Sequence, residues 1–260
     1  MHPFFKHLFT PLWILLFFLC ACKKDEPLSS GIDIFYKSMT SLKLEVAYEE
    51  GAEPYAISTS GDNVWEYAEL NIESLFVQRP LALDVIVPNG LNEMTAIPDQ
   101  NKTGFTVDNI LGLANHYRKS TGNETDGNIF ILFLNGYYRQ DDTLRQTVMG
   151  LHVTGTTVVA VFKPLIASSH VTRVVREFVE QGVVIHEAGH ALGMVNNGLP
   201  LASPHHDSAH GAHCTNSECV MYWQNERTAN ITGFVQNYFG GSKRMIFGDE
   251  CVADVVNYQP

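Results

Sequence analysis

Positive charge is scarce in this chain. Its 260 residues carry 17 Lys and Arg against 28 Asp and Glu, a formal net charge of −11 at pH 7. Such a surface repels nucleic acid, so we expect no nucleic-acid partner. Internal repeats and low-complexity tracts are missing, and beyond residue 22 no apolar run approaches the roughly 20 residues of a membrane span. With 45% apolar residues, the chain is expected to form one sizeable domain and to act as a monomer.

The first 22 residues are typical of a secretory signal. A weakly basic start is followed by an apolar run from Leu12 to Leu19, which is too short to span a membrane comfortably. Charged residues begin abruptly at Lys23. We interpret residues 23–40 as a tether and residues 41–260 as the folded domain.

The junction Leu19-Cys20-Ala21-Cys22 resembles a bacterial lipobox. The resemblance implies that residues 1–22 contain a lipoprotein signal and that Cys22 receives the lipid as the first mature residue. The protein would then be anchored to the outer membrane in the cell envelope, facing the periplasm or the exterior, without crossing the bilayer. A plain cleaved signal and an uncleaved anchor are the alternatives.

The hydropathy pattern predicts strand, helix, strand, helix, three strands and a last helix. Alternating or continuous apolar residues predict the strands, and apolar residues at helical spacing predict the helices. This order favours an α+β fold with a twisted sheet in an upper lobe and a looser lower lobe. The expected strands are 42–48, 81–87, 128–134, 148–154 and 157–162, and the expected helices are 63–76, 107–117 and 172–194.

The most specific motif, His186-Glu187-Ala188-Gly189-His190, lies in the last of these helices. Histidines four residues apart share one face of a helix, so both imidazoles can bind one zinc ion. Glu187 can then act as a general base on water rather than as a ligand. The alternative is a helix with two surface histidines. Two observations oppose it: the motif follows an apolar stretch, and six of the 11 histidines lie between 186 and 213.

With Gly193, the motif reads H-E-x-x-H-x-x-G and resembles the zinc signature of the metzincin metallopeptidases. In that superfamily the glycine lets the chain turn, and a third histidine follows three residues later. Here Asn196 stands at that position, and an amide is a poor zinc ligand. A third ligand is therefore expected elsewhere, because a catalytic zinc usually has three protein ligands.

The segment His213-Cys214-x4-Cys219-x-Met221 resembles the H-C-x4-C-x-M continuation of the archaemetzincins. The resemblance implies that His213 is the third zinc ligand and that Met221 lies in the methionine-containing turn beneath the site. Residues 196–212 would then be an insertion. The alternatives for the third ligand are His205, His206 and His210, which could equally belong to a polar solvent loop.

Archaemetzincins also hold a structural zinc with four cysteines, and the resemblance raises the same question here. Cys214 and Cys219 match the first pair, whereas the later pair is replaced by Cys251-Val252-Ala253-Asp254. Carboxylate oxygen can bind zinc, so Cys214, Cys219, Cys251 and Asp254 could form a second zinc site. In an oxidising compartment, two of the cysteines could instead form a disulfide.

Together these features predict a zinc metalloendopeptidase that acts on extracytoplasmic proteins or peptides. The resemblance implies a metzincin-like α+β fold: a mixed sheet with helices above, a zinc-binding helix, and an irregular, mostly helical lower lobe. We expect the substrate to pair with an edge strand at Val148–Thr154. The alternative is a catalytically inactive, metzincin-like lipoprotein that binds a partner at the surface, which the presence of Asn196 keeps open.

Overall fold

The computed structural model describes residues 32–226 and 246–258. The predicted secretory signal, the predicted lipidation at Cys22 and the first half of the expected tether (residues 23–31) lie outside these residues. Within the described ranges, no helix is both long and apolar enough to cross a membrane.

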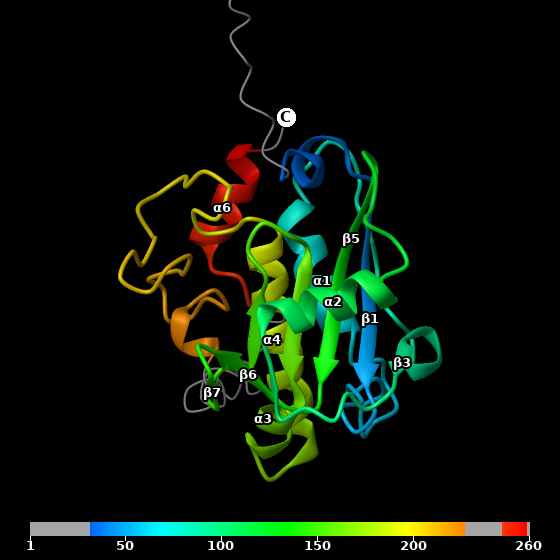
Figure 1. The fold of residues 1–260 in the computed structure, drawn as a ribbon. Coiled ribbons are helices and arrows are strands. Elements are labelled where there is room, and N and C mark those ends of the chain that lie inside the picture. The colour runs from blue at the N-terminus through cyan, green and yellow to red at the C-terminus, as the bar shows by residue number, and fades with distance from the viewer. Residues whose placement is uncertain (1–31, 227–245, 259–260) are drawn as a thin grey trace, which may run out of the picture.

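A six-stranded mixed sheet forms the centre of the molecule (Figure 1). Its strands follow the order β2-β1-β5-β9-β8, and β3 pairs with the far end of β1. All pairs are parallel except β8 with β9, which are antiparallel. The bounds are β1 (Ser41–Glu49), β2 (Asp84–Ile86), β3 (Thr95–Ile97), β5 (Asp126–Leu134), β8 (Gly150–His152) and β9 (Val158–Phe162).

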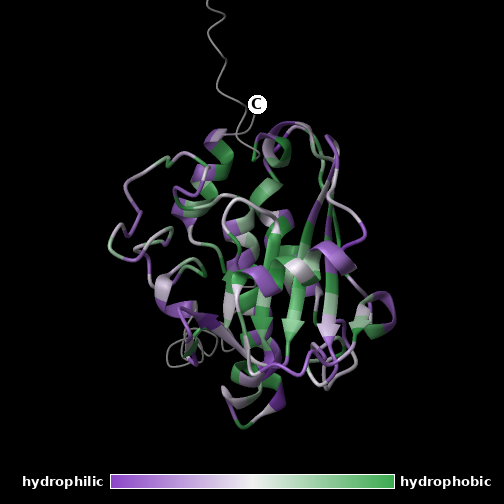
Figure 2. Ribbon diagram, in the orientation of Figure 1, coloured by the Kyte–Doolittle hydropathy of each residue, from purple (hydrophilic) through white to green (hydrophobic). Residues whose placement is uncertain are grey.

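Strand β5 is buried over its whole length apart from its first residue. It pairs with β1 on one side and β9 on the other, so that Ile131 lies between Val46 and Val159. Helices cover both faces of such a strand, which explains why its sequence is continuously apolar rather than alternating. The prediction of a strand buried on both faces is confirmed, and Figure 2 shows the hydrophobic colour along the central strands.

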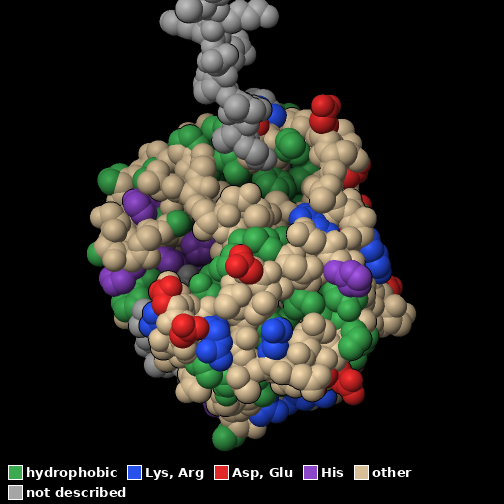
Figure 3. Space-filling model, viewed as in Figure 1, with side chains coloured by type: hydrophobic (Ala, Val, Ile, Leu, Met, Phe, Trp, Pro, Cys, Tyr) green, Lys and Arg blue, Asp and Glu red, His purple; other side chains and the backbone are tan. Residues whose placement is uncertain are grey.

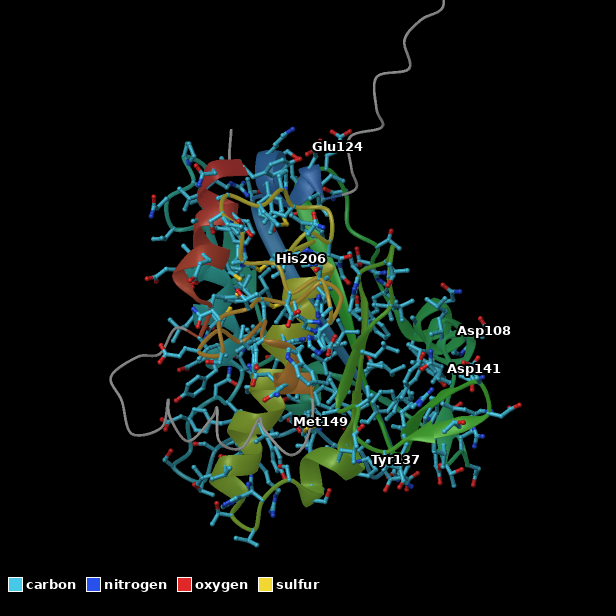
Figure 4. All side chains as sticks on the ribbon, turned by 90° about the vertical axis from the view of Figure 1, so that its left-hand side faces the viewer. Asp108, Glu124, Tyr137, Asp141, Met149 and His206 are labelled. Carbon is cyan, nitrogen blue, oxygen red and sulfur yellow. The ribbon has the colours of Figure 1, made fainter. Side chains whose placement is uncertain are left out.

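Helices pack on both faces of the sheet. α1 (Glu66–Phe76) and α4 (Arg173–Ala191) contact each other on one face, and α2 (Val107–Tyr117) crosses the other. In Figure 4, the sheet lies between α4 and the helix that carries the labelled Asp108, which is α2. The fold is therefore a mixed α+β fold with a twisted mixed sheet, as the order of predicted elements indicated.

The segment before β1 belongs to the folded domain. A short π-helix, η1 (Ile34–Ser38), buries Phe35 and Tyr36. The Tyr36 hydroxyl donates a hydrogen bond to the carbonyl of Leu192 (2.7 Å), and Arg79 donates one to the carbonyl of Phe35 (3.0 Å). The part of the expected tether that the structure describes thus packs against the core.

Two predicted elements differ in their limits. The helix expected over 63–76 begins at Glu66, because Asn63 instead accepts a hydrogen bond from the amide of Trp65 (3.0 Å) in a preceding turn. The strand expected over 81–87 shortens to β2. The minor elements are η2 (Leu91–Glu93), β4 (Gly104–Phe105), β6 (Tyr137–Gln140), β7 (Thr143–Arg145) and α3 (Lys163–Ser168).

The region after Gly193 is irregular in its described part. Residues 194–222 contain no regular helix or strand, and the helical elements that follow are η3 (Trp223–Glu226) and α6 (Asp249–Tyr258). The prediction of a mostly helical lower lobe is therefore wrong for the described residues. Histidine and cysteine contacts, rather than helical periodicity, determine the path of this loop.

Candidate metal centre

Helix α4 carries the predicted histidine motif into the interior. Its second half is buried on all sides, since Val183, Val184 and Ile185 pack in the core and the motif follows directly. His186 and Glu187 are buried within this half. A purely structural role gives no reason to bury so many polar groups in one turn, because polar groups without partners are costly in a protein interior.

α4 ends at Ala191, and Gly193, two residues later, adopts a left-handed conformation (φ +81°). The amide of Gly193 donates to the carbonyl of His190, and that of Met194 donates to the carbonyl of Gly189, each at 3.0 Å. A Cβ atom at position 193 would lie only 2.8 Å from the Ile32 side chain. Glycine is therefore required here both by the backbone conformation and by close packing.

The structure brings His213 to the two histidines of α4. The Nε2 atoms of His186 and His190 are 3.1 Å apart, and the ring of His213 lies 5.3 and 5.0 Å from theirs, centre to centre. One ring nitrogen from each of the three lies within 4.8 Å of the others, and all three residues are buried. They come from α4 and from a loop more than twenty residues farther along the chain.

The donor set fits a zinc ion. Nδ1 of His186 donates to the carbonyl of Val220 and Nδ1 of His213 to that of His210, both at 2.6 Å. These bonds fix the tautomers, so each Nε2 keeps its lone pair for a metal. Ligands at about 2.0–2.1 Å in tetrahedral geometry lie roughly 3.4 Å apart, close to the separation of the two α4 nitrogens.

The side chain of Glu187 extends from α4 toward the edge strand β8. A Cβ atom at Gly150, the first residue of β8, would lie 2.7 Å from Oε1 of Glu187 and 2.8 Å from its Cγ. The carboxylate therefore occupies the space that a side chain at position 150 would fill. In the chain, Glu187 directly follows His186 in the same turn of α4.

Met221 packs against the motif helix from the other side. It is fully buried, and a Cβ atom at Gly189 would lie 2.5 Å from its sulfur. Its carbonyl accepts a hydrogen bond from the amide of Cys214 (2.8 Å), which joins the turn to the loop that carries His213. Met221 thus contacts the helix turn between His186 and His190.

The other candidates for the third ligand lie elsewhere. His206, labelled in Figure 4, contacts the carbonyl of Gly211 (2.7 Å), and His210 is exposed and stacks on Trp223 at 4.0 Å. Asn196 is exposed in a left-handed turn (φ +60°). His210 still contributes, because its carbonyl orients the ring of His213, a role that the sequence did not reveal.

A second cluster brings His205 together with the cysteines. Nδ1 of His205 is 3.3 Å from Sγ of Cys214 and 4.0 Å from Sγ of Cys251, and Sγ of Cys219 is 3.5 Å from Sγ of Cys251. All four side chains are buried. The three cysteines are free thiols in this structure, and the disulfide stays a prediction.

Asp254 supports this cluster from behind. Its Oδ2 accepts a hydrogen bond from Nε2 of His205 (2.8 Å), and its Oδ1 accepts one from the amide of Ala202 (2.6 Å). A carboxylate behind an imidazole is the usual arrangement around a histidine ligand. His205 therefore faces the cysteines through Nδ1, and Asp254 accepts a hydrogen bond from its Nε2.

The hydrogen bonds among the three thiols shift their pKa values in opposite directions. They lower the pKa of Cys214, which favours its thiolate, and raise the pKa values of Cys219 and Cys251. Zinc binds thiolate rather than thiol. The cluster of one imidazole and three sulfurs matches the donors of structural zinc sites.

The edge strand β8 carries His152, whose ring lies 6.4 Å from the ring of His190, centre to centre. In the part of the chain that the structure describes, β8 pairs with β9 alone, so its other edge has no strand partner. β8 also packs against α4. Figure 3 shows histidine side chains gathered around a hollow on this side of the molecule.

No family model and no curated protein matches the chain. A solved structure described as a zinc-dependent peptidase from Methanocorpusculum labreanum is similar with a TM-score of 0.43 and 13% identity, over 82% of this chain and 99% of that one.

Proposed function

We propose that this protein is a zinc-dependent metalloendopeptidase of the metzincin type that hydrolyses extracytoplasmic proteins or peptides. The observation that carries the proposal is the convergence of three buried imidazoles, two of them on the helix that also carries the buried Glu187. His186, His190 and His213 would hold the zinc ion through Nε2. When bound, zinc supplies a Lewis acid that polarises the scissile carbonyl and makes water acidic.

Glu187 is the proposed general base. Its carboxylate would accept a proton from the attacking water and pass it to the leaving amine. Because Gly150 has no side chain, this carboxylate can lie against β8, the strand along which an extended substrate can pair. Base and substrate would then meet at one edge of the sheet.

The inactive alternative rests on Asn196, and the proximity of His213 to His186 and His190 weighs against it. A general base such as Glu187 would have no purpose in a site that only holds metal. We therefore favour the enzyme.

Two finer proposals accompany it. His205, Cys214, Cys219 and Cys251 would bind a second, structural zinc ion with Asp254 behind His205. The domain would be attached to the outer membrane through a lipid on Cys22, consistent with the lipobox-like junction. Mass spectrometry of Cys22 in a membrane fraction tests the anchor directly.

The peptidase activity is tested with Glu187→Ala. We expect cleavage of denatured casein to fall by about 10²–10⁴-fold while the zinc content stays unchanged. Asn196→Ala is the matched control, since Asn196 is exposed and lies outside the histidine cluster. An equally active Glu187→Ala variant would show that another group acts as the base.

A further inference from the structure

A pocket of about 240 Å³ adjoins the candidate metal centre on the side of His190. The β8–β9 turn, the end of α4 and the segment before β1 form its walls. The rings of His152 on β8 and His190 on α4 lie 6.4 Å apart and nearly parallel. The pocket therefore begins at a proposed zinc ligand and at the strand along which we place the substrate.

The chemistry of the walls selects an uncharged occupant. Phe35, Ile32 and Ala191 contribute apolar surface, and Thr156 and Asn197 contribute neutral polar groups. None of the residues that line the pocket is Asp, Glu, Lys or Arg. A charged side chain would lose its hydration here without gaining an ionic partner, which is costly.

The size of the pocket suits a ring. A protein cavity of about 150 Å³ holds one benzene molecule, so this pocket has room for a phenyl or phenol group. Phe35 offers an aromatic surface on one side, and aromatic rings gain free energy from such contacts beyond the area that they bury. The polar groups of Thr156 and Asn197 can accommodate a hydroxyl.

The walls are held in place before any ligand binds. The His152 ring bonds to the carbonyl of Thr156 through Nε2 (2.8 Å), and the Asn197 amide donates to the carbonyl of His190 (2.9 Å). The Tyr36 hydroxyl attaches the segment before β1 to the end of the helix. A preorganised pocket loses little free energy to ordering when it is filled.

We propose that this pocket is the main specificity pocket and that it takes a phenylalanine or tyrosine side chain of the peptide substrate. The proposal rests on the peptidase function above and adds the class of residue recognised. Phe35 and His152 are its specificity-determining residues.

The first test is a cleavage profile on a peptide library, read at every position around the scissile bond. We expect one position to favour Phe and Tyr over Ala and Glu. Phe35→Leu and His152→Gln should each reduce that preference, as a ratio of kcat/KM values, by about tenfold. Ile34→Ala is the control, because Ile34 is exposed on the same segment and does not line the pocket. An unchanged profile in both pocket variants would overturn the assignment.

The second test separates recognition from catalysis. Zinc-loaded Glu187→Ala is titrated with two peptides that differ only by Tyr or Glu at one position, and binding is followed by NMR. The pocket is supported if the Tyr peptide binds more tightly than the Glu peptide and if Phe35→Leu abolishes this difference. Equal affinities for the two peptides overturn it. If the preference is present but the wild-type protein cleaves nothing, the proposed peptidase function fails while the pocket stands.

Discussion

Gly150 lies so close to Glu187 that a single methyl group at position 150 would collide with the carboxylate. The edge strand and the proposed catalytic helix are therefore fitted to each other at the position of the general base. The collision involves Cγ1 of Val183 (2.6 Å) as well as Oε1 and Cγ of Glu187, so a rotation of the carboxylate alone cannot relieve it.

We expect Gly150→Ala to lower kcat/KM by about 100-fold, because displacement of a catalytic group by about 1 Å has an effect of this size. Zinc content should not change, since the histidines are not displaced directly. Gly112→Ala on α2 is the control, as no atom lies within 4 Å of the added methyl group. Full activity in Gly150→Ala would refute the proposed position of Glu187.

We expect His213→Ala to weaken binding of the catalytic zinc by more than about 100-fold, because one of three imidazole donors is lost. His206→Ala and His210→Ala should retain the metal, since these rings lie outside the cluster of three. Zinc affinity is measured by competition with a coloured chelator. Loss of zinc in His206→Ala, with normal binding in His213→Ala, would reassign the ligand.

We expect purified protein to contain two zinc ions and His205→Ala to contain one. Asp254→Asn should keep both ions but bind the second one about 10–100-fold more weakly, because the amide orients the imidazole less strongly. Metal content is measured by atomic emission on protein purified under reducing conditions. A disulfide among Cys214, Cys219 and Cys251, found by mass spectrometry together with a single zinc, would contradict the second site.

The pH dependence of stability should reveal a buried ion pair beneath the site. Glu180 is fully buried beside Lys163, and burial raises its pKa from 4.5 to about 7, against the opposing effect of the Lys163 ammonium. The folded protein therefore binds this proton more tightly than the unfolded chain does. Its contribution to stability is present below pH 4.5 and is lost as the pH rises through about 7.

Glu180→Gln should remove this part of the pH dependence. The free energy of unfolding is measured by denaturant titration between about pH 5 and 8 in both proteins. The wild-type curve should fall more steeply with rising pH than the variant curve. Glu124→Gln, at an exposed position labelled in Figure 4, should follow the wild type. Parallel curves for wild type and Glu180→Gln would show that Glu180 does not titrate in this range.

Local spacing explains what the sequence could predict. His186 and His190 lie on one helix face, so their convergence follows from helical geometry alone. The buried strand β5 and the N-terminal limit of α2 were equally predictable, the latter because Thr106 caps the helix. His213 required a resemblance to a known signature, since no periodicity relates it to α4.

The rest depends on tertiary contacts. His205 lies 46 positions from Cys251, and only the folded loop shows that its imidazole takes the place expected for Asp254. The segment around Tyr36 has no periodicity, so its docking on Leu192 could not be read from hydropathy. The proposed specificity pocket combines residues from three parts of the chain, which no linear pattern joins.

His213 and Cys214 are consecutive residues that face different centres. An ion bound by the cysteine cluster would restrain Cys214. It would therefore also restrain the preceding residue, His213, which is the third proposed ligand of the catalytic zinc. Thermodynamic linkage then requires that each ion raises the affinity for the other by the same factor. When zinc is scarce, such a protein would lose both ions in one cooperative step. Hydrolysis would then stop because the loop that carries His213 and Cys214 is no longer restrained.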